Sequence, residues 1–182
     1  PPWLADSRLC DLEWDRDAFP DPEGMIEDLH DRNFHLSLWE YPYLLTRTHS
    51  FDEAVEEGYL VNDSSGAPYL LARISWGGDR GGIVDFSNPE AREWWKEKHR
   101  DLVEMGVDAF KTDFGEYLPE DAVLDNGKSG RAMRNQQAHL YTKTVYEAIE
   151  EADPDREPLL WARPGWAGGQ QYPVHWGGDP NT

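Results

Sequence analysis

The sequence contains a single cysteine, Cys10, so its 182 residues cannot form an internal disulfide. Nothing in the cysteine usage therefore indicates an oxidising compartment. No apolar run approaches the roughly 18 residues that suggest a membrane-spanning helix, and no signal peptide opens the chain. Without a disulfide framework or an apolar span, we expect a cytoplasmic protein.

Basic residues are also scarce, since 17 Lys and Arg stand against 36 Asp and Glu, for a formal net charge of −19. Nucleic acids and anionic membranes both require a basic surface, so this balance argues against either as a partner. Only five of the 17 basic residues are lysines. Few lysines among many acids suggest a salt-adapted protein, and a stability that fell as salt rose would contradict that hypothesis.

Aromatic residues are abundant, with nine Trp and eight Tyr. In a core they only add bulk, whereas in a cleft their flat rings can stack on the apolar faces of sugar rings. An acidic, aromatic-rich composition is therefore compatible with carbohydrate binding without requiring it.

Strand-like and helix-like segments alternate along the chain, which favours βα units and a parallel sheet. The expected helices span residues 22–33, 50–58, 89–105 and 131–152, and the expected strands span 34–39, 83–86, 107–113, 158–163 and 174–178. Phe51, Ala54 and Val55 are expected to face inward from the second helix. The pattern predicts an α/β fold made of several consecutive units of a (β/α)8 TIM barrel. Because the chain opens on Pro-Pro without a methionine, we interpret it as a fragment of a longer protein.

Two aspartates share a context that suggests chemistry. Asp113 and Asp179 each follow a short apolar stretch beside glycine and aromatic residues. In a parallel barrel the carboxyl ends of the strands meet at one rim, whatever their separation in sequence. Two carboxyl groups around a glycosidic bond are what acetal hydrolysis requires. A second interpretation of Asp113 is open, because an Asp after a strand often only caps the next helix.

Several motifs, in order along nearly the whole chain, resemble glycoside hydrolase family 31, and within it the bacterial and archaeal α-xylosidases. They are Cys-Asp-Leu-Glu-Trp-Asp at 10–15, Phe-Pro-Asp-Pro-Glu-Gly-Met-Ile at 19–26, Val-Asp-Phe-Ser-Asn-Pro at 84–89, Lys-Thr-Asp-Phe-Gly-Glu at 111–116, Ala-Arg at 162–163 and Pro-Val-His-Trp-Gly-Gly-Asp at 173–179.

The resemblance implies a retaining exo-α-glycosidase that hydrolyses terminal α-xylosides through a covalent glycosyl-enzyme. Asp113 matches the family's nucleophile and Asp179 its acid/base. The substrate would be a small oligosaccharide or glycoside, and no cofactor or metal is needed. The alternatives are an α-glucosidase, another activity of the family such as a sulfoquinovosidase, or a sugar-binding remnant without turnover.

The resemblance also implies which residues touch the sugar. Lys111 and Arg163 match positions that contact hydroxyl groups, and Trp39 and Trp176 match aromatics that line the same subsite. Trp76 is a weaker match in a loop that aligns poorly.

Two positions depart from the family pattern near these residues. Pro164 stands where a small hydroxyl residue is expected, and Glu40 where a neutral residue is usual. We expect both near the pocket, where they bear on substrate identity. The resemblance further implies that residues 1–182 are part of the catalytic barrel, with the N-terminal β-domain and the C-terminal part of the barrel lying outside them. The full-length protein could also be a homo-oligomer.

The six histidines show no metal-ligand spacing with one another, so the sequence predicts no metal site.

Overall fold

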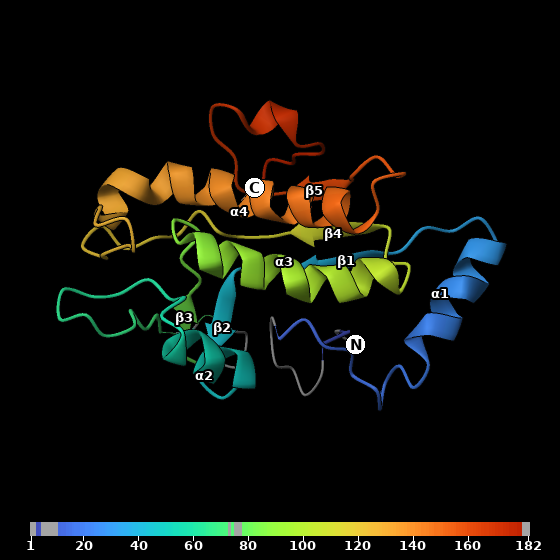
Figure 1. Ribbon diagram of the computed structural model, residues 1–182, viewed down its shortest axis with the longest axis horizontal. Helices are drawn as coiled ribbons and strands as arrows, with labels where there is room; N and C mark the ends of the chain where they lie inside the picture. The colour runs from blue at the N-terminus through green and yellow to red at the C-terminus, as the bar shows by residue number, and fades with distance from the viewer. Residues whose placement is uncertain (1–2, 5–10, 73, 75–77, 180–182) are drawn as a thin grey trace.

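Three short parallel strands form the sheet that positions the rest of the chain (Figure 1). The computed structural model describes residues 3–4, 11–72, 74 and 78–179. The sheet has the order β1-β4-β5, from β1 (Ser37–Glu40), β4 (Ala109–Thr112) and β5 (Leu160–Ala162). Parallel strands joined through long helices confirm the predicted α/β fold and the partial TIM barrel.

The segment at 174–178, expected to be a strand, contains only an isolated parallel bridge between Ala162 and His175. The Ala162 N–H donates to the Val174 carbonyl at 2.7 Å, and the Trp176 N–H donates to the Ala162 carbonyl at 3.2 Å. The segment therefore lies beside β5 in parallel register. It leaves the extended conformation at Gly178, whose φ of 77° lies in the left-handed region that favours glycine.

A second, antiparallel pair lies outside the parallel sheet. It joins β2 (Tyr43–Leu45) to β3 (Gly81–Ile83). The strand expected at 83–86 instead begins at Gly81 and ends at Ile83, which is the first residue of the expected range. Glycine permits this pairing, because a Cβ on Gly81 would lie 2.3 Å from the Leu44 carbonyl oxygen.

Helix α2 (His49–Glu56) follows β2 and precedes β3 along the chain. The Thr48 side chain caps it by accepting the Phe51 N–H at 3.2 Å. Ala54 is buried and Phe51 half-buried, as predicted. The prediction that Val55 faces inward was wrong, because this residue is 41% exposed. It follows Ala54 directly, and successive residues of a helix point about 100° apart.

Helices α1 and α3 each begin with a side-chain cap followed by proline. Asp21 accepts the Gly24 N–H at 3.0 Å before α1 (Pro22–Asp31). Asn88 accepts the Glu90 N–H at 2.8 Å before α3 (Pro89–Glu104). In both helices proline takes the first position, where its missing N–H costs nothing.

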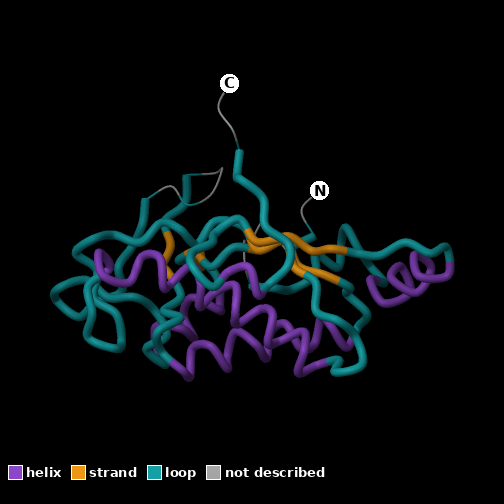
Figure 2. Tube along the Cα trace, turned by 90° about the horizontal axis from the view of Figure 1, so that it is seen from above, coloured by secondary structure: helices purple, strands orange, loops and turns teal. Residues whose placement is uncertain are grey.

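Helix α4 (Gly130–Ala152) is the longest, and a 3-10 turn, η2 (Gly169–Gln171), follows β5. Helices α3 and α4 pack against each other on one side of the parallel strands (Figure 2). Strand residues alternate between the two faces of the sheet. Leu38, Phe110 and Leu160 are buried on the helix side. Trp39, Lys111 and Trp161, which are register partners, lie on the opposite side near the carboxyl ends.

Candidate active site

The carboxyl ends of the parallel strands bring six of the seven predicted site residues together. Trp39 and Lys111 lie on β1 and β4, and Asp113 and Arg163 directly follow β4 and β5. The segment paired beside β5 adds Trp176 and Asp179. The seventh predicted residue, Trp76, lies outside the described residues.

Asp113 is held by donors on both carboxylate oxygens. Trp39 Nε1 donates to Oδ2 at 2.8 Å, and the Phe114 N–H donates to Oδ1 at 2.9 Å. The Asp113 N–H in turn donates to the Glu40 carbonyl at 2.9 Å. The helix-capping interpretation of Asp113 does not hold, because the next helix begins only at Gly130. The residue is 7% exposed, so its carboxylate is both buried and oriented.

The turn after Asp113 has an unusual backbone. Phe114 has φ +54° and Gly115 has φ +87°. A bulky residue in the left-handed region is uncommon, and such strain often accompanies functional sites. A Cβ on Gly115 would lie 2.8 Å from the Tyr141 ring, so only glycine fits there without a shift. The Phe114 ring lies under the Arg163 guanidinium, and Arg163 Cζ is 4.3 Å from the centroid of that ring.

Arg163 connects the two predicted catalytic aspartates. Its Nη1 lies 3.4 Å from Asp113 Oδ1 and 3.4 Å from Asp179 Oδ2. Because both oxygens lie at that distance from one nitrogen, they are no more than twice as far, 6.8 Å, from each other. A cation between two carboxylates offsets their mutual repulsion. The two acids therefore lie near each other, on either side of one guanidinium nitrogen.

Lys111 and Trp176 complete the wall of the site. Lys111 Nζ lies 3.6 Å from Asp113 Oδ2 and 4.7 Å from the centroid of the Trp176 ring. The ammonium therefore touches a carboxylate and an aromatic face at once. On the other side, the Trp39 ring packs on Tyr41 with centroids 5.0 Å apart.

The two aspartates differ in environment. The Asp113 side chain is 10% exposed, whereas that of Asp179 is 88% exposed. Fixed donors surround the first, while solvent reaches the second. That asymmetry suits one group that stays in place and one that exchanges protons with a ligand or with water.

Two residues of the site were not predicted to belong to it. Glu116 is one of them, because its Oε1 lies 2.9 Å from Arg163 Nη2. Phe114 supplies the ring beneath the same guanidinium. The only sequence signal was their place in the turn that follows Asp113.

Glu40 does not line the pocket, and that expectation was wrong. It is fully buried on the helix side of β1, with Oε2 3.3 Å from His99 Nε2 on α3. Strand alternation explains the difference, because Trp39 faces the site and its neighbour must face the opposite way. Pro164 follows Arg163 and is buried.

In the part of the chain that the structure describes, no helix is both long and apolar enough to cross a membrane.

Comparison with curated proteins finds relatives that act on sugars. The chain is 38% identical over 162 residues to "Alpha-xylosidase XylQ" of Lactiplantibacillus pentosus, covering 88% of this chain and 21% of that protein. It is 37% identical over 180 residues to an alpha-xylosidase of Emericella nidulans, covering 97% and 22%. A sulfoquinovosidase of Escherichia coli is 36% identical over 176 residues, covering 96% and 26%. The chain thus spans about a fifth to a quarter of the length of these relatives.

Solved structures agree with this picture. A GH31 family sulfoquinovosidase from E. rectale, in complex with the aza-sugar inhibitor IFGSQ, superposes with a TM-score of 0.86 at 30% identity, covering 97% of this chain and 28% of that one. A GH31 dextranase of Flavobacterium johnsoniae, complexed with glucose, also gives 0.86, at 27% identity, covering 97% and 22%. The family model described as "Glycosyl hydrolases family 31 TIM-barrel domain" matches residues 3–182. The chain therefore belongs to glycoside hydrolase family 31, in its TIM-barrel domain.

Proposed function

We propose that this chain carries the catalytic centre of a retaining exo-α-glycosidase that hydrolyses terminal α-xylosides through a covalent glycosyl-enzyme. The observation that carries the proposal is the shared contact of Arg163 Nη1, 3.4 Å from an oxygen of Asp113 and 3.4 Å from one of Asp179. A retaining glycosidase needs its carboxyl groups about 5–5.5 Å apart, which is within the limit that this contact sets. Similarity to two alpha-xylosidases supports the choice of sugar.

In the first step Asp113 is the nucleophile. One of its carboxylate oxygens attacks the anomeric carbon, and the bond from that carbon to the glycosidic oxygen breaks. Asp179 gives its proton to the departing oxygen, so the aglycone leaves as a neutral alcohol. The Trp39 donor at 2.8 Å keeps the attacking carboxylate in one orientation.

In the second step the roles at Asp179 reverse. The side chain, now ionised, takes a proton from a water molecule as that water attacks the same anomeric carbon. The bond to Asp113 breaks and its carboxylate is restored. Two inversions at one carbon leave the sugar with its original configuration.

The polar and aromatic neighbours account for binding of a sugar ring. Lys111 and Arg163 carry N–H donors beside Asp113, where they can contact ring hydroxyls. Trp39 and Trp176 provide apolar faces for the ring. Trp76 stays a prediction. A xyloside, a glucoside and a sulfoquinovoside differ in the group on C5, which is hydrogen, hydroxymethyl or sulfomethyl, so the space around that carbon decides among them.

The test uses the full-length protein with nitrophenyl α-xyloside, α-glucoside and α-sulfoquinovoside, comparing kcat/KM. We expect the xyloside to be preferred, with release of α-xylose first when the product is followed by NMR. A fluorinated xylosyl donor should label Asp113 in the peptide mass spectrum. Preference for another of the three sugars would change the substrate assignment only. β-Xylose as first product would overturn the retaining mechanism, and sugar binding without turnover or label would favour a non-catalytic protein.

A further inference from the structure

Two histidines and an aspartate meet at the opposite end of the parallel strands from the candidate active site. His30 lies at the end of α1, His35 just before β1 and Asp108 just before β4. Their ligand atoms all lie within 4.8 Å of one another. Strands of this length span roughly 13 Å, so this cluster and the carboxyl-end site are separate.

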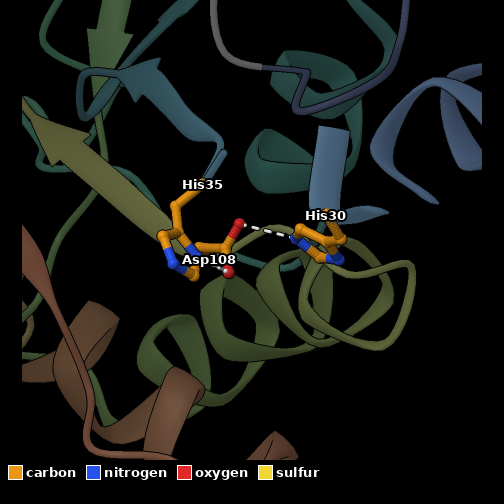
Figure 3. Close-up of side chains that lie close together, drawn as sticks. All are labelled: His30, His35 and Asp108. Atoms are coloured by element: carbon orange, nitrogen blue, oxygen red, sulfur yellow. Dashed lines mark hydrogen bonds and ion pairs between the residues drawn. The ribbon is translucent and has the colours of Figure 1, made fainter. Parts of the chain in front are cut away.

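Asp108 is the centre of the cluster (Figure 3). Its Oδ2 lies 2.8 Å from His30 Nε2, and its Oδ1 lies 2.9 Å from His35 Nδ1. The Leu36 N–H donates to Oδ2 at 2.7 Å and fixes the carboxylate. The Asp108 side chain is 16% exposed, while the two imidazoles are 38% and 80% exposed. A fixed carboxylate therefore lies beneath two imidazoles that solvent can reach.

We propose that His30, His35 and Asp108 bind one divalent transition-metal ion, with Zn²⁺ as the preferred metal. Two imidazole nitrogens and one carboxylate oxygen are a donor set that suits Zn²⁺, whereas Mg²⁺ and Ca²⁺ prefer oxygen ligands. Water takes the fourth tetrahedral position. Zinc–ligand bonds of about 2.0–2.2 Å put neighbouring ligand atoms roughly 3.3 Å apart. The two histidine–carboxylate contacts therefore need to open by about 0.5 Å, and the two imidazole nitrogens, which lie within 4.8 Å of each other, need to reach the same spacing.

One neighbour works against the ion. Arg156 Nη1 lies 4.0 Å from Asp108 Oδ1 and adds positive charge near the site. The same nitrogen donates to the Val107 carbonyl at 3.1 Å, so the guanidinium is already partnered by a backbone acceptor.

The bound metal would act as a clamp. It would tie the end of α1 to the segments that enter β1 and β4, three stretches that are distant in sequence. An ion that binds the folded state only stabilises it by mass action. No local motif points to this site, because the aspartate lies 73 residues beyond His35.

The experiment measures Zn²⁺ binding to the full-length protein by competition with a chromophoric chelator, alongside the absorption spectrum of the Co²⁺ form. The variants are His30→Gln and His35→Gln. The matched control is His49→Gln, an exposed histidine 3.0 Å from Glu13 and 3.6 Å from Asp11 that has carboxylate partners without a second histidine. We expect each cluster variant to lose one equivalent of Zn²⁺, with affinity at least about tenfold weaker. The control should keep the wild-type stoichiometry.

Thermal unfolding gives a second readout. Micromolar Zn²⁺ should raise the melting temperature of the wild-type protein and of His49→Gln, but not that of either cluster variant. The proposal is overturned if the wild-type protein binds no more Zn²⁺ than the variants do. It is also overturned if Mg²⁺ raises the melting temperature as much as Zn²⁺ does. Because glycosidase activity is not the readout, failure here leaves the proposed function untouched.

Discussion

Trp39 Nε1 donates a hydrogen bond to Asp113 Oδ2 at 2.8 Å, across two neighbouring parallel strands. The donor fixes one oxygen of the proposed nucleophile and leaves the indole ring facing the site. A hydrogen bond to a charged group contributes about 1.5–3 kcal/mol. Trp39→Phe keeps an aromatic ring and removes the donor, so kcat/KM for nitrophenyl α-xyloside should fall by about 10–100-fold.

The control for this substitution is Trp94→Phe. Trp94 lies on α3 and packs on Tyr59, with ring centroids 5.5 Å apart. It should affect thermal stability more than turnover. Equal losses of kcat/KM in the two variants, at equal folded fractions, would contradict a specific role for the Trp39 donor.

The two proposed catalytic acids should respond differently to the leaving group. Asp113→Asn removes the nucleophile, so turnover should vanish for every substrate while the circular dichroism spectrum stays unchanged. Asp179→Asn removes the proton donor, which an acidic nitrophenol hardly needs and an alkyl alcohol needs strongly. We expect activity on alkyl α-xyloside to fall by about 10²–10⁴-fold, with a much smaller loss in the first step on nitrophenyl α-xyloside. Losses independent of the leaving group would exclude the acid role of Asp179.

Glu116 is expected to act through Arg163. Its Oε1 holds Nη2 at 2.9 Å, while Nη1 lies between the two aspartates. Glu116→Gln keeps the shape and loses the charge, so the guanidinium should be less well oriented and kcat/KM should fall by roughly 3–10-fold. Arg163→Lys should cost far more, because an ammonium cannot contact three carboxylates with a planar fork. If Glu116→Gln matched Arg163→Lys in its effect, Glu116 would be part of the chemistry and not a positioning residue.

The grouping of the predicted residues at the carboxyl ends of the strands could be predicted largely from the sequence, whereas their roles stay predictions. Asp113 follows an apolar strand and Gly115 supplies the turn, and both features are local. The parallel sheet then brings Arg163 beside them because strand ends share one edge. What the sequence could not give was the bridging contact of Arg163 with Asp179, since that distance depends on how the irregular segment after β5 runs.

Other failures have a similar origin. The strand expected at 83–86 begins at Gly81 and pairs antiparallel with β2. Glycine allows the close backbone approach at this position, whereas the low strand propensity of glycine predicts a loop. Glu40 was placed near the pocket from its position next to Trp39, whereas strand alternation sends it to the opposite face. Long-range partners such as His99, on another element, are not encoded in any local pattern.

The pair formed by Glu40 and His99 should be strongly coupled. Both residues are fully buried, and His99 Nδ1 lies 2.7 Å from the Trp95 carbonyl oxygen, which leaves Nε2 facing the carboxylate at 3.3 Å. His99→Leu leaves a buried carboxylate without its partner, which should cost about 3–5 kcal/mol of unfolding free energy. The double variant Glu40→Leu with His99→Leu should be more stable than His99→Leu alone. A double-mutant cycle on chemical denaturation of the full-length protein measures the coupling, and additive effects would contradict it.

Lys96 offers a test at alkaline pH. Its ammonium lies 2.8 Å from Glu93 and 2.8 Å from Glu151 of α4, and its side chain is 8% exposed. Burial by itself would lower the pKa of Lys96, but the hydrogen bonds to Glu151 and Glu93 outweigh it and raise that pKa above its usual value. Because the pKa of Lys96 is higher in the folded state than in the unfolded state, the charged lysine stabilises the fold. This stabilisation is complete at pH values below the unfolded pKa of about 10.4, and it disappears as the pH rises through the folded-state pKa.

Lys96→Met removes the charge and keeps most of the apolar stem, so at pH 7 it should lower the unfolding free energy by about 1–2 kcal/mol. Lys143→Met is the matched control on α4, since Lys143 is 42% exposed and lies 3.4 Å from Glu147, and it should change stability by less than about 0.5 kcal/mol. The measurement is the melting-temperature difference between wild type and each variant from pH 7 to pH 11.5. For Lys96→Met that difference should stay constant up to about pH 10 and then shrink, because the wild-type protein loses the ammonium that the variant never had. A difference that stayed the same across the whole range would mean that the loss at pH 7 comes from packing and not from the ion pairs.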